Sequence, residues 1–206
     1  HLLITDCDMA IVHNGQVNNK YFNELDKSRL KTECDTEALL HFYAQYGELE
    51  IQKNIPGAYS LAIADKRKKE LMVLRDRSGI RPGAIGLKDG KYQAASEDKA
   101  FVENGGRLVK EMKPGSIYYF DVNGGFRRVD VVNSNLKFCF FEPNYLAHHE
   151  STLRGINVNS IRDALGEQVG FEFRERFPSE KVDFVSYLPR CPESAARGFS
   201  RITGIT

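Results

Sequence analysis

The sequence of 206 residues lacks a strong net charge and lacks any long apolar run. Its formal net charge is +1, so no global electrostatic field attracts nucleic acid or an anionic membrane surface. No apolar run approaches the roughly 20 residues that a membrane-spanning helix requires. We therefore expect neither nucleic acid nor a membrane among the partners of this chain.

Paired cysteines are also lacking, because Cys7, Cys34, Cys139 and Cys191 are scattered and form no Cys-x-x-Cys motif. This spacing argues against a zinc ribbon and favours reduced thiols in a cytoplasmic protein. The sequence has no recognisable signal peptide, internal repeat, low-complexity segment or Gly-x-x-x-x-Gly-Lys phosphate loop. A hydrophobic content of 41% and a charged content of 28% predict an ordinary globular protein.

The first two thirds of the chain are rich in predicted strands. Apolar runs between turn signals predict strands at 9–12, 58–64, 70–75, 92–96 and 116–122. Helical spacing predicts a short helix over 18–27 and a clearer one that Asp35 or Thr36 caps and Gly47 ends. Asp89-Gly90 is the clearest hairpin turn, and the basic run at 66–69 is expected at a solvated hairpin tip.

The pattern changes near residues 133–137. An amphipathic helix is predicted over 157–173, with Val158, Ile161, Leu165 and Val169 facing inward. Residues 182–188 are apolar enough for a central parallel strand, and residues 193–203 for the helix that follows it. We therefore expect two domains of different class, joined near residue 135.

The most informative motif is His13-Asn14-Gly15, directly after the first apolar run. Asn and Gly tolerate positive φ, so the strand is expected to end there in a tight turn. Such a turn can aim the Asn amide and a backbone N–H at one point, and two converging donors suit an oxyanion. Taken alone, Asn-Gly is first of all a common hairpin turn.

In order and spacing, this tripeptide together with residues 33–37 and 76–82 resembles the glutaminase domain of class II glutamine amidotransferases, which are N-terminal-nucleophile hydrolases. Residues 139–147, Cys-Phe-Phe-Glu-Pro-Asn-Tyr-Leu-Ala, are similar to the Cys-x-Phe-Glu-x-x-Tyr-x-Ala segment of one branch, the glutamine phosphoribosylpyrophosphate amidotransferases (amidophosphoribosyltransferases) of purine biosynthesis. The glutaminase motifs alone also suit glucosamine-6-phosphate synthase or asparagine synthetase.

The resemblance implies an α+β fold. Residues 1–135 would form a four-layer α/β/β/α glutaminase domain that lacks its N-terminal part. Residues 136–206 would be the incomplete start of an α/β type I phosphoribosyltransferase domain. The implied reaction hydrolyses glutamine, and the ammonia then displaces pyrophosphate from phosphoribosylpyrophosphate to give 5-phosphoribosylamine. Mg²⁺ would take part at a site beyond this sequence.

The same resemblance assigns roles to individual residues. Asn14 would donate its side-chain amide, and Gly15 its backbone N–H, to the oxyanion of the tetrahedral intermediate. Asp35 would bind the α-ammonium group of glutamine, although a helix N-cap is the plainer interpretation of the residue alone. Arg81 would organise the glutamine site or the domain interface, with an exposed side chain on a rigid loop as the alternative. His13 is expected to be a packed residue rather than a base.

Further ligands follow from the family. Cys139 stands where some members ligate a [4Fe–4S] cluster, which needs several further thiolates; the alternative is a small buried residue. The implied partners are glutamine, phosphoribosylpyrophosphate, nucleotide feedback inhibitors and further copies of the chain in a homo-oligomer. His148-His149 replaces the usual Arg-Pro and is expected on the surface rather than at a metal.

The sequence departs from the family in three ways, one of which is that the Asp-Asp phosphoribosylpyrophosphate loop would lie beyond Thr206. No N-terminal Cys is present, and His1 cannot replace it, because the mechanism needs a thiolate and a free α-amine on one residue. Arg190 and Pro192 stand where the family has an acidic residue and a glycine that approaches phosphate. We expect an incomplete segment of a longer enzyme. The alternatives are a non-catalytic homologue that binds glutamine or a nucleotide, and another class II amidotransferase.

Overall fold

The structure is a computed structural model that describes residues 2–6, 8–188 and 191–206. The chain divides into two compact units, unit 1 (1–138) and unit 2 (139–206). The boundary predicted near residue 135 lies three residues before this division. The identities assigned to the two domains stay predictions.

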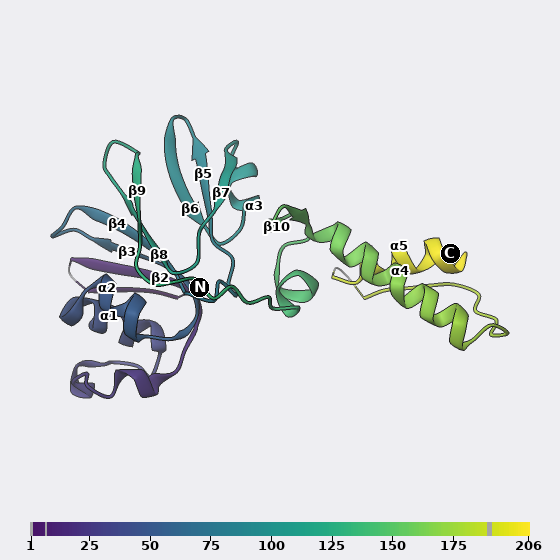
Figure 1. Cartoon of the computed structure of the whole chain (residues 1–206), viewed down its shortest axis with the longest axis horizontal. Helices are drawn as coiled ribbons and strands as arrows, with labels where there is room; N and C mark the ends of the chain where they lie inside the picture. The colour runs from purple at the N-terminus through teal and green to yellow at the C-terminus, as the bar shows by residue number, and fades with distance from the viewer. Residues whose placement is uncertain (1, 7, 189–190) are drawn as a thin grey trace. The chain divides into compact units, whose positions relative to one another are not determined.

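Unit 1 is built on two antiparallel sheets (Figure 1). The six-stranded sheet has the order β1 (Leu2–Asp6), β2 (Met9–Val17), β3 (Gly57–Asp65), β4 (Glu70–Arg75), β8 (Ser116–Phe120) and β9 (Phe126–Asp130). The three-stranded sheet has the order β6 (Lys91–Ala95), β5 (Ala84–Lys88) and β7 (Arg107–Glu111). The two sheets supply the inner layers of the fold.

Two apolar clusters hold the layers of unit 1 together. Helices α1 (Asp35–Tyr46) and α2 (Glu48–Asn54) cover one face of the six-stranded sheet (Figure 1), where Leu39 and Ile51 are fully buried. A second cluster lies between the sheets and consists of Val73, Ile85, Met112, Tyr118 and Phe120. Burying each such side chain stabilises the fold by about 1.5–3 kcal/mol. These layers are therefore held by side-chain packing.

The fourth layer is reduced to a single short helix, α3 (Lys99–Val102). Its buried Phe101 lies against Gly86, where a Cβ atom would come within 2.4 Å of the ring. The neighbouring Ile85 faces the other sheet, so alternation along β5 places Phe101 on the outer face of the small sheet. The layers α/β/β/α are those that the sequence predicts.

Most predicted elements of unit 1 are present, with some changes of length. Asp89 and Gly90 have φ values of 49° and 75° and connect β5 to β6, which confirms the hairpin turn. Gly47 ends α1 and donates its N–H to Tyr43 O at 2.8 Å. The helix expected over 18–27 is wrong, since two 3₁₀ turns, Asn19–Phe22 and Lys27–Arg29, occupy this region.

The tight turn expected at Asn14-Gly15 is also wrong. Strand β2 continues through both residues to Val17, because β3 runs opposite it along its whole length, with Asn14 paired to Ser60 and Gly15 to Tyr59. The local preference of Asn-Gly for a turn is overridden by the long partner strand. Sequence reasoning also missed the second half of β2, the helices α2 and α3, and six further strands: β1, β5, β7, β9, β10 (Thr152–Leu153) and β11 (Ile156–Asn157).

Unit 2 contains a π-helical turn, Glu142–Leu146, a two-residue hairpin of β10 (Thr152–Leu153) and β11 (Ile156–Asn157), and the helices α4 (Val158–Arg176) and α5 (Glu193–Thr203). Both helices confirm predictions from the sequence. A Cβ atom on Gly166 would lie 1.9 Å from Ala195 O, and one on Gly198 would lie 2.0 Å from Asp163 O. The two helix backbones are therefore in direct contact along a seam of glycines.

The predicted inward face of α4 is only partly right. Val158 is fully buried, but Val169 is 57% exposed. The other buried positions of the helix are Arg162, Gly166 and Gly170, at a spacing of four residues. The small size of glycine, rather than apolar character, selects the face that contacts α5.

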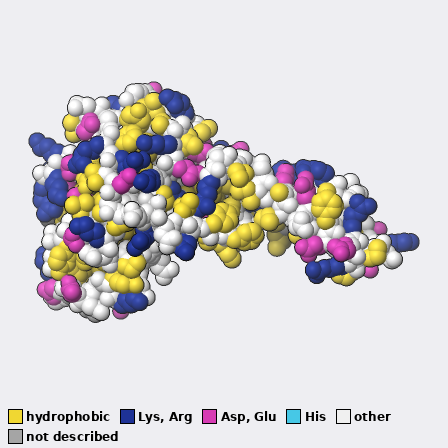
Figure 2. Space-filling model, in the orientation of Figure 1, with side chains coloured by type: hydrophobic (Ala, Val, Ile, Leu, Met, Phe, Trp, Pro, Cys, Tyr) yellow, Lys and Arg dark blue, Asp and Glu magenta, His cyan; other side chains and the backbone are white. Residues whose placement is uncertain are grey.

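The strand predicted over 182–188 is wrong. These residues form no regular structure, and Phe184 and Leu188 are 70% and 82% exposed. A strand is stabilised by a ladder of hydrogen bonds to a neighbouring strand. In the described chain Val185 N donates to Thr206 O at 3.3 Å, but no strand pairs with this segment. Figure 2 shows apolar side chains open to solvent among basic and acidic ones on the face drawn. Across residues 2–6, 8–188 and 191–206, no helix combines the length and apolarity needed to cross a bilayer.

Candidate functional site

Strand β2 carries the predicted site residues on both its faces. Its odd-numbered residues Ile11, His13 and Val17 are buried toward α1, because they alternate with the even-numbered ones. Val12 and Asn14 face the opposite side, where they line a cleft of about 200 Å³ with Ser60, Ala62, Val73 and residues 94–96. The peptide groups of the strand, by contrast, point along the plane of the sheet.

The backbone N–H of Gly15 points away from β3. Tyr59, opposite Gly15, exchanges both its main-chain hydrogen bonds with Asp76, because its N–H donates to Asp76 Oδ2 at 3.1 Å and its carbonyl accepts from Asp76 N at 3.0 Å. Gly15 and Tyr59 thus form a non-hydrogen-bonded pair, in which each main chain faces outward. Described pairing with β1 ends at Leu2–His13, two residues earlier. The Gly15 N–H therefore points to the side of β2 opposite β3, the side on which the proposed oxyanion would lie.

Asp35 lies at the same edge. Its Oδ2 accepts the N–H of Val17 at 2.7 Å, two residues along β2 from Gly15 and on the same side of the strand. Oδ1 lies 3.4 Å from the Thr36 hydroxyl and 3.7 Å from Cys34 Sγ. The Asp35 side chain is 20% exposed, so its carboxylate is held in place and remains within reach of a cation. The N-cap interpretation is wrong, because Cys34 occupies the cap position and Asp35 is the first helical residue.

The Asn14 amide joins the two sheets. Its Nδ2 donates to Ser96 Oγ at 2.9 Å, across 82 residues of sequence. An amide nitrogen has two protons, so one donor of Asn14 remains for a ligand in the cleft. This hydrogen bond to Ser96 orients the Asn14 amide.

His13 is 94% buried and packs as predicted, between β2 and the start of α1. Its Nδ1 lies 3.0 Å from Thr36 Oγ1 and 3.9 Å from Asp35 Oδ1. Burial lowers the pKa of His13; Asp35 opposes this shift, and the charge of Arg81 adds to it. The structure thus brings Asp35 to the edge of β2, two residues from Gly15, while Asn14 lies on the face of the strand opposite His13. Arg81 lies on the loop that Arg75 fixes, and Cys139 belongs to unit 2.

Two residues that sequence reasoning passed over fix the loop that carries Arg81. The buried guanidinium of Arg75 donates to the carbonyl oxygens of Gly79, Arg81 and Met112 at 2.6–3.0 Å. Asp76 accepts the N–H groups of Ser78 and Gly79, and burial raises the pKa of its carboxyl group. Gly79 has φ of 60°, as a turn requires. Asp76, the first residue of the motif at 76–82, therefore fixes the loop together with Arg75. Its position at the start of the motif could have suggested this role.

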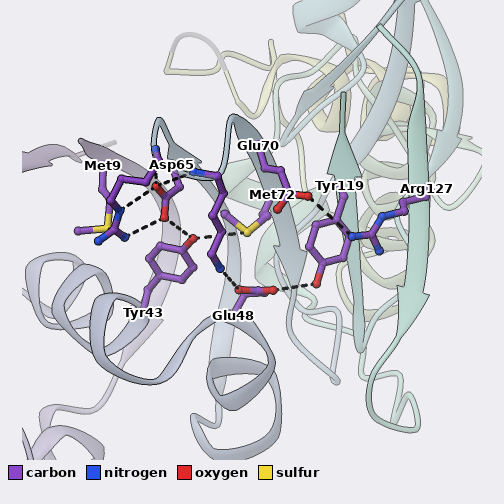
Figure 3. Close-up of polar contacts among 10 residues, drawn as sticks. Met9, Tyr43, Glu48, Asp65, Glu70, Met72, Tyr119 and Arg127 are labelled. Atoms are coloured by element: carbon purple, nitrogen blue, oxygen red, sulfur yellow. Dashed lines mark hydrogen bonds and ion pairs between the residues drawn. The ribbon is translucent and has the colours of Figure 1, made fainter. Parts of the chain in front are cut away.

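The basic run at 66–69 forms the tip of the β3–β4 hairpin, as predicted, and two of its four charges are paired with acidic residues, Asp65 and Glu48 (Figure 3). Arg67 donates from Nε and Nη2 to Asp65 at 3.1 and 2.8 Å, and Lys68 lies 3.2 Å from Glu48 Oε2. Arg67 and the hydroxyl of Tyr43 hold the pKa of Asp65 well below its usual range. Burial and the nearby Glu48 raise the pKa of Tyr119 to about 12. This network fastens α1 and α2 to the sheet and does not present a phosphate site.

The thiols do not fit an iron–sulfur cluster within the described residues. Cys34, Cys139 and Cys191 are free, and no three cysteines come together there, whereas a [4Fe–4S] cluster is held by four thiolates. Arg190 lies outside the described residues, and Pro192 precedes the first turn of α5. The phosphoribosyl and cluster predictions therefore gain no support from side-chain geometry.

Known proteins are similar to almost the whole chain. A family model described as a glutamine amidotransferase domain matches residues 2–123. The amidophosphoribosyltransferases of Bacillus subtilis and Methanothermobacter thermautotrophicus are 31% and 29% identical over 96% of this chain. The solved structure of the B. subtilis glutamine phosphoribosylpyrophosphate amidotransferase, complexed with ADP and GMP, matches 99% of this chain with a TM-score of 0.85 and 28% identity.

The chain spans 42–46% of the length of these relatives. The part of this chain that matches them includes residues 2–123, which the family model covers. It also includes the motifs at 13–15, 33–37, 76–82 and 139–147, on which the sequence prediction rested. Because the model covers more than half of the chain, and the fold, order of motifs and site geometry agree with it, this chain belongs to the glutamine amidotransferase domain family, with the α/β/β/α fold of an N-terminal-nucleophile hydrolase.

Proposed function

We propose that this chain provides the glutamine-binding half of an amidophosphoribosyltransferase. The observation that carries the proposal is the edge of β2, where the outward N–H of Gly15 and the carboxylate of Asp35 stand two residues apart on the same side of one strand. Two residues of a strand span about 7 Å, a distance that a molecule of glutamine can bridge. The side-chain amide oxygen of glutamine would accept from the Gly15 N–H, and its α-ammonium group would donate to the Asp35 carboxylate.

Each residue then has a defined role. Asp35 takes the α-ammonium group, while its second oxygen keeps the Val17 N–H. The N–H of Gly15 and the free proton of the Asn14 amide stabilise the oxyanion that forms when the amide carbon is attacked. Removing one such donor typically reduces the rate by about 10²–10³. Arg81 organises the site through its fixed loop.

The attacking group would be the N-terminal Cys of a mature chain, whose α-amine acts as its base. The relatives' names support phosphoribosylpyrophosphate as the acceptor of the ammonia, with Mg²⁺ at a site beyond residue 206. The ADP and GMP in the B. subtilis structure support nucleotide feedback inhibitors as further ligands. We extend the proposal to a homo-oligomer in the cytoplasm, in agreement with the free thiols of the described chain.

Glutamine binding tests the site directly. We would titrate the 206-residue chain with glutamine, and with 4-carbamoylbutanoate, which lacks the α-ammonium group. Asp35→Asn should weaken glutamine binding by about tenfold or more, since a charged hydrogen bond contributes about 1.5–3 kcal/mol, and should leave the analogue unaffected. Glu33→Gln, an exposed carboxylate two residues away, is the matched control. Equal losses for both ligands would refute the ammonium role of Asp35.

The whole-enzyme proposal has its own test. Intact mass and N-terminal sequencing of the natural protein will show where the mature chain begins. A start at Cys, upstream of His1, supports a working amidotransferase. A natural start at His1 excludes glutaminase catalysis by this mechanism and favours the non-catalytic binding module.

A further inference from the structure

Two histidines and a glutamate lie close together on one turn of unit 2, whereas the residues proposed to bind glutamine belong to unit 1. His148, His149 and Glu150 each offer one ligand atom, and these atoms all lie within 4.8 Å of one another. His148 and Glu150 are exposed and His149 is half-buried. Among the residues that the structure describes, no other three His, Cys, Asp or Glu side chains come together in this way.

The backbone beneath these three side chains is fixed. Ser151 N donates to His148 O at 3.0 Å and closes the turn. The start of α4 holds its other carbonyls, because Asn159 N donates to His149 O at 3.0 Å and Asn157 Nδ2 to Glu150 O at 3.3 Å. All three candidate ligands are therefore attached to a main chain that needs no rearrangement.

The two imidazoles are also oriented. Their rings stack with centroids 4.5 Å apart and planes at 29°. His148 Nδ1 accepts from Glu150 N at 3.3 Å, and His149 Nδ1 lies 3.5 Å from Asn159 Nδ2, whose side-chain oxygen accepts from Ser194 in α5. These two long contacts are replaced when a metal binds, because a metal at Nε2 moves the ring proton to Nδ1, which then no longer accepts an N–H.

We propose that this turn binds one divalent transition-metal ion of the Zn²⁺ type through His148, His149 and Glu150. Imidazole and carboxylate suit Zn²⁺, whereas Mg²⁺ prefers oxygen ligands alone. Zn–N bonds of about 2.0–2.1 Å place tetrahedral ligand atoms about 3.4 Å apart. Rotation of exposed side chains closes the remaining gap, and water completes the coordination.

Calorimetric titration of the 206-residue chain with Zn²⁺ tests this site. One ion per chain should bind, in the presence of excess Mg²⁺, and binding should weaken in acid because protonated imidazole has no lone pair to offer. The double variant His148→Ala, His149→Ala should lower the affinity by about tenfold or more, since it removes two of three protein ligands. His41→Ala is the control, because His41 lies in unit 1, 4.0 Å from Glu37.

Binding to the free thiols is the main competing outcome, and Co²⁺ distinguishes it. Cobalt bound by nitrogen and oxygen gives weak visible bands, whereas cobalt thiolates add intense near-ultraviolet absorption. Thiolate bands, or equal affinity in the wild type and the double variant, would overturn the proposal. Glu150→Gln provides a second variant on an exposed position and should weaken binding without affecting the circular dichroism of α4 and α5.

Discussion

Each of the two units is stabilised by a different kind of internal packing. The described residues of unit 1 include 26 buried apolar side chains besides proline, whereas in unit 2 only Ala147, Val158 and Pro143 are buried apolar residues among those described. In unit 2 the contact is made by backbones along the glycine seam and by Arg162, whose guanidinium donates to Pro143 O and Ala147 O. Side-chain volume therefore decides stability in one unit, and close approach of main chains decides it in the other.

The largest effect is expected at Gly15 in unit 1. An alanine Cβ would lie 2.1 Å from Ala58 O and 2.6 Å from Tyr59 Cα, at a φ of 153° that disfavours L residues. We expect Gly15→Ala to destabilise unit 1 by about 3 kcal/mol or more, because backbone rather than a flexible side chain must move. Hydrogen exchange resolved by peptide would report this loss separately for each unit.

Gly47→Ala is the control for positive φ alone, since its φ is 84° and no atom lies within 4 Å of the added Cβ. It should cost only about 1 kcal/mol. Similar losses at the two glycines would mean that conformation, rather than contact, limits Gly15.

In unit 2, Gly166→Ala should reverse the usual rule. Alanine in place of a helical glycine normally stabilises by about 1 kcal/mol. Here the Cβ would collide with Ala195 O, so we expect α4 and α5 to separate and unit 2 to lose about 1–3 kcal/mol. Faster hydrogen exchange in both helices, with unit 1 unchanged, would confirm it. Stabilisation would show that the seam is not in contact in solution.

A change of pH should act on unit 1 through His13. Burial lowers the pKa of His13 in the folded state, so the unfolded chain takes up a proton first as the pH falls through about 6.5. Unit 1 therefore loses stability in acid, and His13→Gln should reduce the slope of stability against pH between 7 and 5. Urea unfolding at several pH values measures it, with His41→Gln as the control. An unchanged slope in His13→Gln would contradict the attribution of the acid destabilisation to His13.

The smallest effect is expected at Phe184. Because its side chain is 70% exposed, Phe184→Ser should change stability by no more than about 0.5 kcal/mol. Phe101→Ser, at a position only 2% exposed in unit 1, should cost about 3–5 kcal/mol. A large loss at Phe184 would show that residues 182–188 do form the buried strand that their composition predicts.

The comparison also explains what sequence could predict. Strands with alternating or continuous apolar residues and helices with good end signals, such as α1 and α5, are encoded locally and were located closely. The continuation of β2 through Asn14-Gly15 depends on β3, which is 40 residues away, and the glycine face of α4 depends on α5. The apolar segment 182–188 has no partner strand among the described residues, and apolar composition alone does not form a strand.

The site shows the same division. The motifs indicated Asn14, Gly15, Asp35 and Arg81, and the structure brings Asp35 to the edge of β2 near Gly15 and joins Asn14 to Ser96. The supporting contacts of Thr36, Ser96, Arg75 and Asp76 were not predicted, because each depends on elements brought together only by folding. The roles in binding and catalysis assigned to Asn14, Gly15, Asp35 and Arg81 stay predictions.

The hydrogen bond from Val17 to Asp35 has a consequence for strand pairing. Unsatisfied N–H and C=O groups along a strand can pair with a foreign strand, which leads to aggregation. Asp35 already accepts the Val17 N–H, so a foreign strand cannot take this position of β2. The carboxylate proposed to select the substrate would therefore also block strand addition beside Gly15.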